Sequence, residues 1–200
     1  MGIFGPNQSE IWKEFAGEIE GDFIEGGVFQ AKKIISRFEN WTITIDTYSQ
    51  STGSSTATYT RFRAPYLEVE NMDFKIYKRG IFSGIGRAFG MKDIATGDRE
   101  FDEKFVIKAN NEEKLKEFFE SDRIKQLIQT EDKIKIETKR DKSPFSAKLP
   151  QGVNQIYFLG NGVIKDKERL ENIYFLMVFM LRQLTKIGVA STEDPKVELR

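Results

Sequence analysis

The chain of 200 residues contains no cysteine and no histidine. The absence of cysteine excludes a disulfide framework, a thiol nucleophile and a thiolate zinc site. The absence of histidine excludes an imidazole zinc ligand and a Ser-His-Asp triad. Catalysis would have to use carboxylate, lysine or tyrosine groups, or a hard cation held by oxygen ligands. Because such residues occur in every protein, they form no catalytic signature here, and we expect a protein that is not an enzyme and uses no metal or cofactor.

The chain also has no net charge, because 31 lysine and arginine residues balance 31 aspartate and glutamate residues. Without a global positive field, nucleic acid is not an expected partner. An anionic partner, such as a membrane surface or an acidic protein, would have to bind to a local patch of basic residues.

Long apolar runs are missing as well. The longest, Ile173 to Leu181, falls far short of the roughly 20 residues that a membrane-spanning helix needs. The N-terminal residues show no basic region followed by an apolar stretch, so no secretory signal is predicted. We expect a cytoplasmic protein, with a peripheral position at the membrane as the alternative.

Enough apolar residues remain for a sizeable core. The chain is 39% hydrophobic and includes 17 phenylalanines, which suits one domain or two tightly packed halves. Capping residues and helical spacing of apolar residues predict four helices. These are an opening helix from Ser9 to Gly21, a helix capped by Asn110 or Asn111, a helix capped by Ser121, and a long helix from Asp166 to Ile187.

Strict alternation marks the strands. Trp41, Ile43 and Ile45 alternate with polar residues, and the segment 42–60 is rich in serine and threonine. This pattern predicts a long hairpin in which Trp41–Ser49 pairs with Thr56–Arg63. A hydroxyl-rich outer face could bind carbohydrate, although threonine is also simply a good residue for an exposed strand.

The order of these elements predicts an α+β fold. We expect a large antiparallel sheet of about eight strands with an N-terminal helix, a central helix pair and a long C-terminal helix. Residues 1–190 are assigned to a single globular domain, whose two halves would meet near residues 80–100, and residues 191–200 to a flexible tail.

The segment that stands out is a basic, glycine-rich loop at residues 78–92. Residues 74–92 include basic side chains and no acid, whereas acidic residues dominate from Asp93 to Glu103. Glycines interrupt an apolar string that a loop would not normally expose. We predict a binding surface here, with four anion contacts and two apolar anchors: Lys78, Arg79, Arg87 and Lys92, with Phe82 and Phe89.

Three other interpretations of this segment stay open. The glycines at 84, 86 and 90 imitate a phosphate-binding loop, but no βαβ unit surrounds them. The acidic turn from Asp98 to Glu103 resembles a calcium loop, but the required Gly and Glu positions hold other residues. In the third interpretation, Phe101 and Phe105 are part of the core, and the carboxylates of the acidic turn form ion pairs with the neighbouring basic loop.

The stretch from Gly84 to Lys108 also carries a motif, Gly97-Asp98-x-Glu100-Phe101-Asp102-x-x-Phe105-x-Ile107-Lys108, followed by a capped helix. It resembles a family of uncharacterised bacterial proteins classed as a domain of unknown function. The resemblance implies a bacterial protein, and some family members are tethered to membranes by hydrophobic segments that this chain lacks. The family has no assigned activity, so the resemblance transfers no catalytic residue.

The expected function is a non-enzymatic binding or assembly module whose partner is an unidentified protein or an anionic membrane surface. The alternative is a domain that binds a small apolar ligand between the sheet and the C-terminal helix. The lining of that cavity would consist of Tyr157, Tyr174, Phe175, Met177 and Phe179. The apolar C-terminal helix would also explain a homodimer, although burial within one chain explains the same pattern.

Overall fold

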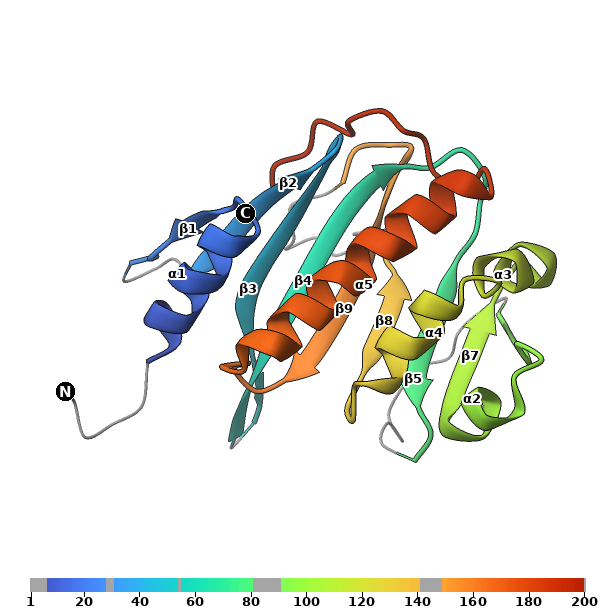
Figure 1. Ribbon diagram of the computed structural model, residues 1–200, viewed down its shortest axis with the longest axis horizontal. Coiled ribbons are helices and arrows are strands. Elements are labelled where there is room, and N and C mark those ends of the chain that lie inside the picture. The colour runs from blue at the N-terminus through green and yellow to red at the C-terminus, as the bar shows by residue number, and fades with distance from the viewer. Residues whose placement is uncertain (1–6, 28–30, 54, 81–90, 141–148, 200) are drawn as a thin grey trace.

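The computed structural model describes residues 7–27, 31–53, 55–80, 91–140 and 149–199. In this part of the chain, nine strands form one antiparallel sheet and five helices accompany it (Figure 1). The predicted α+β class, with an N-terminal helix, a central helix pair and a long C-terminal helix, is confirmed.

All neighbouring strands in the sheet run antiparallel, in the order β1-β2-β3-β4-β9-β8-β5-β7-β6. The C-terminal strand therefore lies in the middle and joins the strands of the N-terminal half to those of the central segment. The strands are β1 (Asp22–Ile24), β2 (Lys33–Phe38), β3 (Trp41–Thr52), β4 (Ser55–Leu67), β5 (Phe74–Lys78), β6 (Lys92–Asp93), β7 (Phe105–Ala109), β8 (Lys135–Thr138) and β9 (Val153–Asn161).

Side chains at the helix N-termini explain where most of the helices begin. Asn111 accepts a hydrogen bond from the Lys114 amide, and Asp166 accepts one from the Arg169 amide, as capping residues do. The first helix is capped by Asn7, not by Ser9 as the sequence suggested, because Asn7 and Glu10 form a reciprocal capping box. The helices are α1 (Gln8–Glu18), α2 (Arg99–Lys104), α3 (Glu112–Phe118), α4 (Asp122–Gln129) and α5 (Lys167–Lys186).

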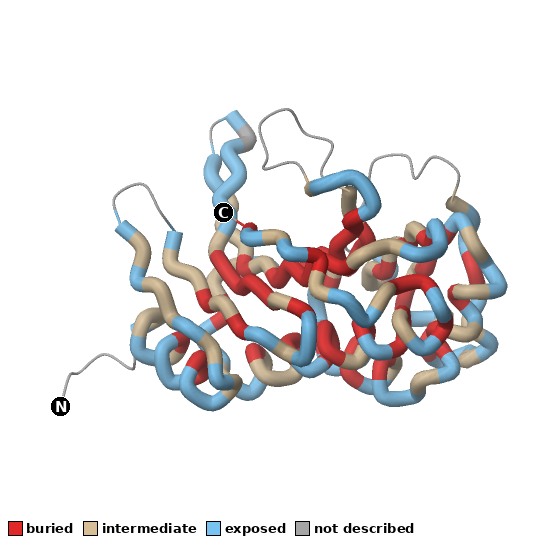
Figure 2. Tube along the Cα trace, turned by 90° about the horizontal axis from the view of Figure 1, so that it is seen from above, coloured by how far each residue is buried: buried red, intermediate tan, exposed pale blue. Residues whose placement is uncertain are grey.

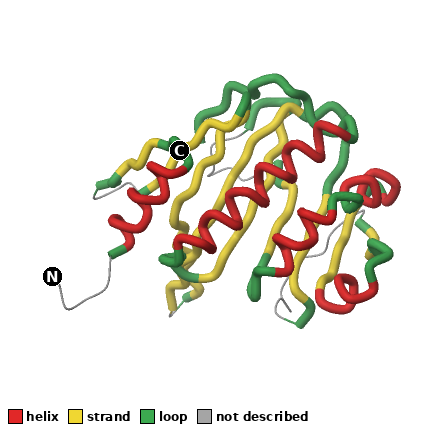
Figure 3. The backbone as a smooth tube through the Cα atoms, viewed as in Figure 1, coloured by secondary structure: helices red, strands yellow, loops and turns green. Residues whose placement is uncertain are grey.

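Helices α1, α4 and α5 cover the same face of the sheet (Figure 3). Alternate strand residues such as Ile45, Phe62 and Phe158 point to this face and are fully buried. They join apolar residues of α1 and α5 in one core cluster, which runs through the interior of the molecule (Figure 2). Aromatic rings meet edge to face there, as in the pair Phe62 and Phe158 with ring centroids 5.5 Å apart.

The predicted β3–β4 hairpin is present and is longer, with Ser49 opposite Thr58. Pairing continues to Thr52 opposite Ser55, beyond the expected strand ends at Ser49 and Thr56. The short helix α2 was not predicted as a helix. Its first turn is capped by Asp98, which accepts a hydrogen bond from the Phe101 amide, and Phe101 is buried as one interpretation of the acidic turn expected.

A charged network connects the ends of four central strands of the sheet. Arg140, after β8, donates two hydrogen bonds of 2.6 Å to the carboxylate of Asp73, before β5. It also contacts the carboxylate of Glu68, after β4. Asn154, at the start of β9, is fully buried and donates to Glu68 at 3.1 Å. The network therefore connects β4 and β9, on one side of the β8–β9 pairing, with β8 and β5 on the other side.

Replacement of Tyr66 by phenylalanine is expected to raise the free energy of unfolding by about 1 kcal/mol, because it removes a buried hydroxyl that has no hydrogen-bond partner among the described residues. Burial, with Glu68 and Asp73 nearby, raises the pKa of Tyr66. Above about pH 10 the unfolded chain therefore ionises this tyrosine while the folded chain does not, and stability falls.

Urea unfolding of both proteins near neutral pH and near pH 11 checks this prediction. The phenylalanine variant should be the more stable at neutral pH, and the difference should widen at the higher pH. A variant that is less stable at neutral pH would show that the hydroxyl has a partner in solution.

Candidate functional site

The structure places three of the six predicted contact residues. Lys78, at the end of β5, forms an ion pair of 3.1 Å with the exposed Asp132. Arg79 follows it and is exposed, and Lys92, in β6, is exposed as well. The remaining three, Phe82, Arg87 and Phe89, lie outside the described residues. Whether the six act together stays a prediction.

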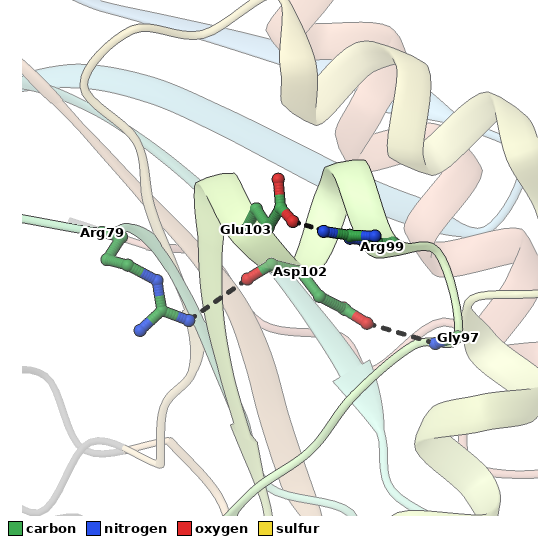
Figure 4. Close-up of a pocket in the computed structure, with 5 residues that line it drawn as sticks. All are labelled: Arg79, Gly97, Arg99, Asp102 and Glu103. Carbon is green, nitrogen blue, oxygen red and sulfur yellow. Dashed lines mark hydrogen bonds and ion pairs between the residues drawn. The ribbon is translucent and has the colours of Figure 1, made fainter.

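Arg79 borders an open hollow of about 580 Å³ beside α2 (Figure 4). Its guanidinium donates a hydrogen bond of 3.1 Å to the main-chain oxygen of Asp102. The carboxylate of Asp102 is occupied within its own loop, since it accepts hydrogen bonds from the amides of Thr96 and Gly97. Asp102 therefore does not neutralise Arg79 through its carboxylate, which leaves the guanidinium charge facing the hollow.

The acidic residues near α2 form no cation site. Arg99 pairs with Glu103 at 2.9 Å and Lys104 with Glu100 at 2.6 Å, both on the exposed side of the helix. Across the described residues, no group of three or more acidic side chains could hold a metal ion.

A second concentration of charge lies on the face of the sheet opposite α1, α4 and α5. The strand registers align one residue from each of five neighbouring strands in a row across that face. We call this row and its neighbours the Tyr157 cluster. Its members are Asp46, Arg61, Arg63, Lys75, Lys135, Glu137, Lys139 and Tyr157.

Two arginines share one carboxylate in this cluster. Asp46 on β3 accepts hydrogen bonds of 2.5 and 2.7 Å from Arg61, and one of 2.7 Å from Arg63. The side chains of Asp46 and Arg63 are only 5% and 8% exposed. Burial lowers the pKa of Arg63, and the neighbouring Arg61 lowers it further, whereas Asp46 opposes this shift.

Tyr157 lies directly opposite Arg63 and Glu137 in the neighbouring strands. The ammonium of Lys139 sits 4.5 Å from the centre of its ring, a cation–π contact. Burial raises the pKa of this tyrosine, and the guanidinium of Arg61 opposes the shift. The phenol therefore remains neutral near neutral pH.

The other half of the cluster repeats the pattern with lysines. Glu137 is paired with Lys75 at 3.4 Å and with Lys135 at 3.0 Å. Together with Lys139, the cluster holds five cationic side chains against two carboxylates. It can therefore present a partly buried surplus of positive charge, with arginine forks that suit carboxylate or phosphate oxygens.

Sequence reasoning missed this cluster and assigned Tyr157 elsewhere. Tyr157 was expected beside α5, but its strand neighbours Ile156 and Phe158 enter the core, so Tyr157 must point to the opposite face. Of the other proposed cavity-lining residues, Phe175 is 44% exposed and Met177 is fully buried in the core. These residues do not line one common space. The available signal was the spacing of Arg61 with Arg63 and of Lys135 with Glu137 and Lys139, which puts each set on one strand face.

No helix in the described part of the chain is long and apolar enough to cross a membrane. The chain matches no known protein family, and it matches no curated protein. Its fold is similar to that of a solved structure, the mycobacterial trehalose monomycolate transport factor A, with a TM-score of 0.52. The two chains are 10% identical over 92% of this chain and 97% of the other. At this identity the similarity concerns the fold alone.

Proposed function

We propose that the protein is a non-enzymatic binding module that holds an anionic partner on the face of its sheet opposite α1, α4 and α5, at the Tyr157 cluster. The observation that carries this proposal is the imbalance of five cationic side chains and two carboxylates in a partly buried site. Each of the two carboxylates is shared by two cations, so a bound anion would add counter-charge to a partly buried, net positive site.

The available donors favour an anion with several oxygens. Arg61 directs two hydrogen bonds to Asp46, but a guanidinium has five N–H groups, so further donors can bind a ligand. Among the described residues, Lys139 contacts the ring of Tyr157 and no carboxylate. Carboxylate and phosphate groups both fit this chemistry.

The basic loop predicted from the sequence supports the same class of function at a second place. Arg79 and Lys92 are exposed and could contact an acidic protein or an anionic membrane surface. In this proposal the protein is bacterial, belongs to the family whose motif it resembles, and acts in the cytoplasm or at the membrane face. A homodimer through α5 would use its exposed Phe175.

Anion binding is tested by the thermal midpoint of unfolding in citrate and in pyrophosphate, each against sodium chloride of equal ionic strength. A ligand at 100 times its Kd stabilises the folded state by about 2.7 kcal/mol, and each kcal/mol raises the midpoint of a chain of this size by about 2–4 °C. We expect a rise of several degrees with at least one of the two anions.

Three variants with the same change in charge locate the site. Lys135→Gln with Lys139→Gln should remove most of the rise, while leaving Lys75 to pair with Glu137. The matched control, Lys116→Gln with Lys186→Gln, changes two exposed helix residues and should keep the rise. Loss of the rise in Arg79→Gln with Lys92→Gln, but not in the cluster variant, would place binding at the loop and refute the proposed site.

A further inference from the structure

A groove of about 730 Å³ adjoins the Tyr157 cluster on the same face of the sheet. One wall is formed by strands β1 to β3, and the other by the C-terminal residues 194–199. The volume lies within the range of about 300–1,000 Å³ that is usual for small-molecule sites. The lining contains the apolar residues Ile24, Ile35, Val197 and Leu199, the hydroxyl groups of Thr42 and Thr44, three cations and two acids. Arg37 pairs with Asp194, which leaves Lys33 and Lys196 against Glu198.

One part of the groove is apolar. Ile24 and Ile35 come from neighbouring strands, and Val197 and Leu199 face them from the C-terminal segment. Leu199 is only 6% exposed. Leu199 is already covered, so the apolar surface that an alkyl chain would remove from water is that of the half-buried Ile24, Ile35 and Val197.

The C-terminal wall is anchored to the sheet. Arg37 on β2 forms an ion pair of 3.0 Å with Asp194. Asn40 donates a hydrogen bond of 2.8 Å to the main-chain oxygen of Thr192. These contacts hold the segment across the strands, so the groove is part of the folded structure.

The other part of the groove opens onto the cationic residues. Lys33 on β2 is directly opposite Asp46, and Thr44 on β3 is directly opposite both Ile35 and Arg63. Directly opposite residues on one face have Cβ atoms about 4.5–5.5 Å apart, so the groove and the cluster are adjacent. Within the described residues, the ammonium of Lys33 forms no ion pair.

We infer that the ligand of this face is an amphipathic anion: a carboxylate or phosphate headgroup binds beside Lys33 and Arg63, and an alkyl chain lies in the groove between β2 and residues 197–199. This inference rests on the proposed function and adds the class of ligand. The row from Ile35 through Thr44 to Arg63 supports it, because the surface changes from apolar to cationic along that line.

Calorimetric titration with butanoate, hexanoate and octanoate tests the inference. Each buried CH₂ contributes favourably to binding, so two added methylenes should lower Kd about tenfold. Octyl phosphate, as a second arm, shows which of the two headgroups is preferred. 1-Octanol, which has the chain without the charge, should bind at least tenfold more weakly than octanoate.

Single substitutions separate the two parts of the site. Ile35→Ser and Leu199→Ser should reduce the dependence of Kd on the length of the alkyl chain. Lys33→Gln should raise the Kd of every anion about tenfold and leave the Kd of 1-octanol unchanged. Val69→Ser, at a position that is 67% exposed, is the matched control for loss of an apolar side chain and should bind like the parent protein. Circular dichroism of each variant confirms that it is folded.

The outcomes distinguish this inference from the proposed function. If citrate or pyrophosphate binds but chain length has no effect, the amphipathic ligand is wrong and the anion site stands. If Kd still depends on chain length in both Ile35→Ser and Leu199→Ser, the alkyl chain binds elsewhere and the inference is wrong. If no anion of any kind binds, both proposals fail.

Discussion

Replacement of Arg140 by alanine is expected to lower the free energy of unfolding by about 2–4 kcal/mol. Arg140 is the cation between Glu68 and Asp73, whose side chains are 15% and 25% exposed. Without it, two carboxylates face each other in a partly buried site. The buried amide of Asn154 contacts both and cannot neutralise them.

Urea unfolding of the parent protein and the variant measures this loss. Arg99→Ala is the matched control, because Arg99 forms an ion pair with Glu103 in which the two side chains are 92% and 63% exposed. An exposed pair of this kind is worth about 0–1 kcal/mol. Equal losses in Arg140→Ala and Arg99→Ala would contradict the role assigned to the network.

Replacement of Asp46 by asparagine should have two opposite effects. The free energy of unfolding should fall by about 2–4 kcal/mol, because Arg61 and Arg63 lose the carboxylate that they share in a partly buried site. Anion affinity should rise at least tenfold, because the same substitution increases the positive charge of the Tyr157 cluster by one. Asp46 would then serve stability at the expense of anion affinity, a form of the trade-off between stability and function.

Both effects are measured on one purified variant, by urea unfolding without anion and by calorimetric titration with citrate. Added citrate should restore part of the lost stability, since a ligand that binds only the folded state stabilises it. A variant that loses stability and also binds citrate more weakly would show that Asp46 orients the arginines for the ligand. Unchanged stability would mean that the arginines find other partners.

Features set by neighbouring residues were predictable from the sequence. The buried face of the hairpin follows from the alternation of Ile43 and Ile45 with polar residues, since a shift by one residue would expose them. Helices α3 and α5 begin at Asn111 and Asp166 because the side chain of each satisfies a free amide three residues later. These are short-range effects, so a single sequence displays them.

The candidate site was not predictable in the same way. Asp46 and Arg61 meet through a hairpin, but Tyr157 reaches them only because β9 pairs with β4. Glu137 joins because β8 pairs with β9. Local patterns do not specify which distant strands pair, so five strands that share one row appear in the sequence as unrelated polar residues. The glycine-rich loop stood out instead, because its charges are contiguous along the chain.

The most direct test of the central claim is an NMR titration of the labelled protein with citrate, followed through its backbone amide and arginine side-chain signals. The cationic surplus on the face opposite α1, α4 and α5 predicts that the largest shifts occur at Arg63, Tyr157 and Lys139, and that they saturate together with a single Kd. Shifts confined to residues 78–92, or no saturable shift at all, would contradict an anion site on this face.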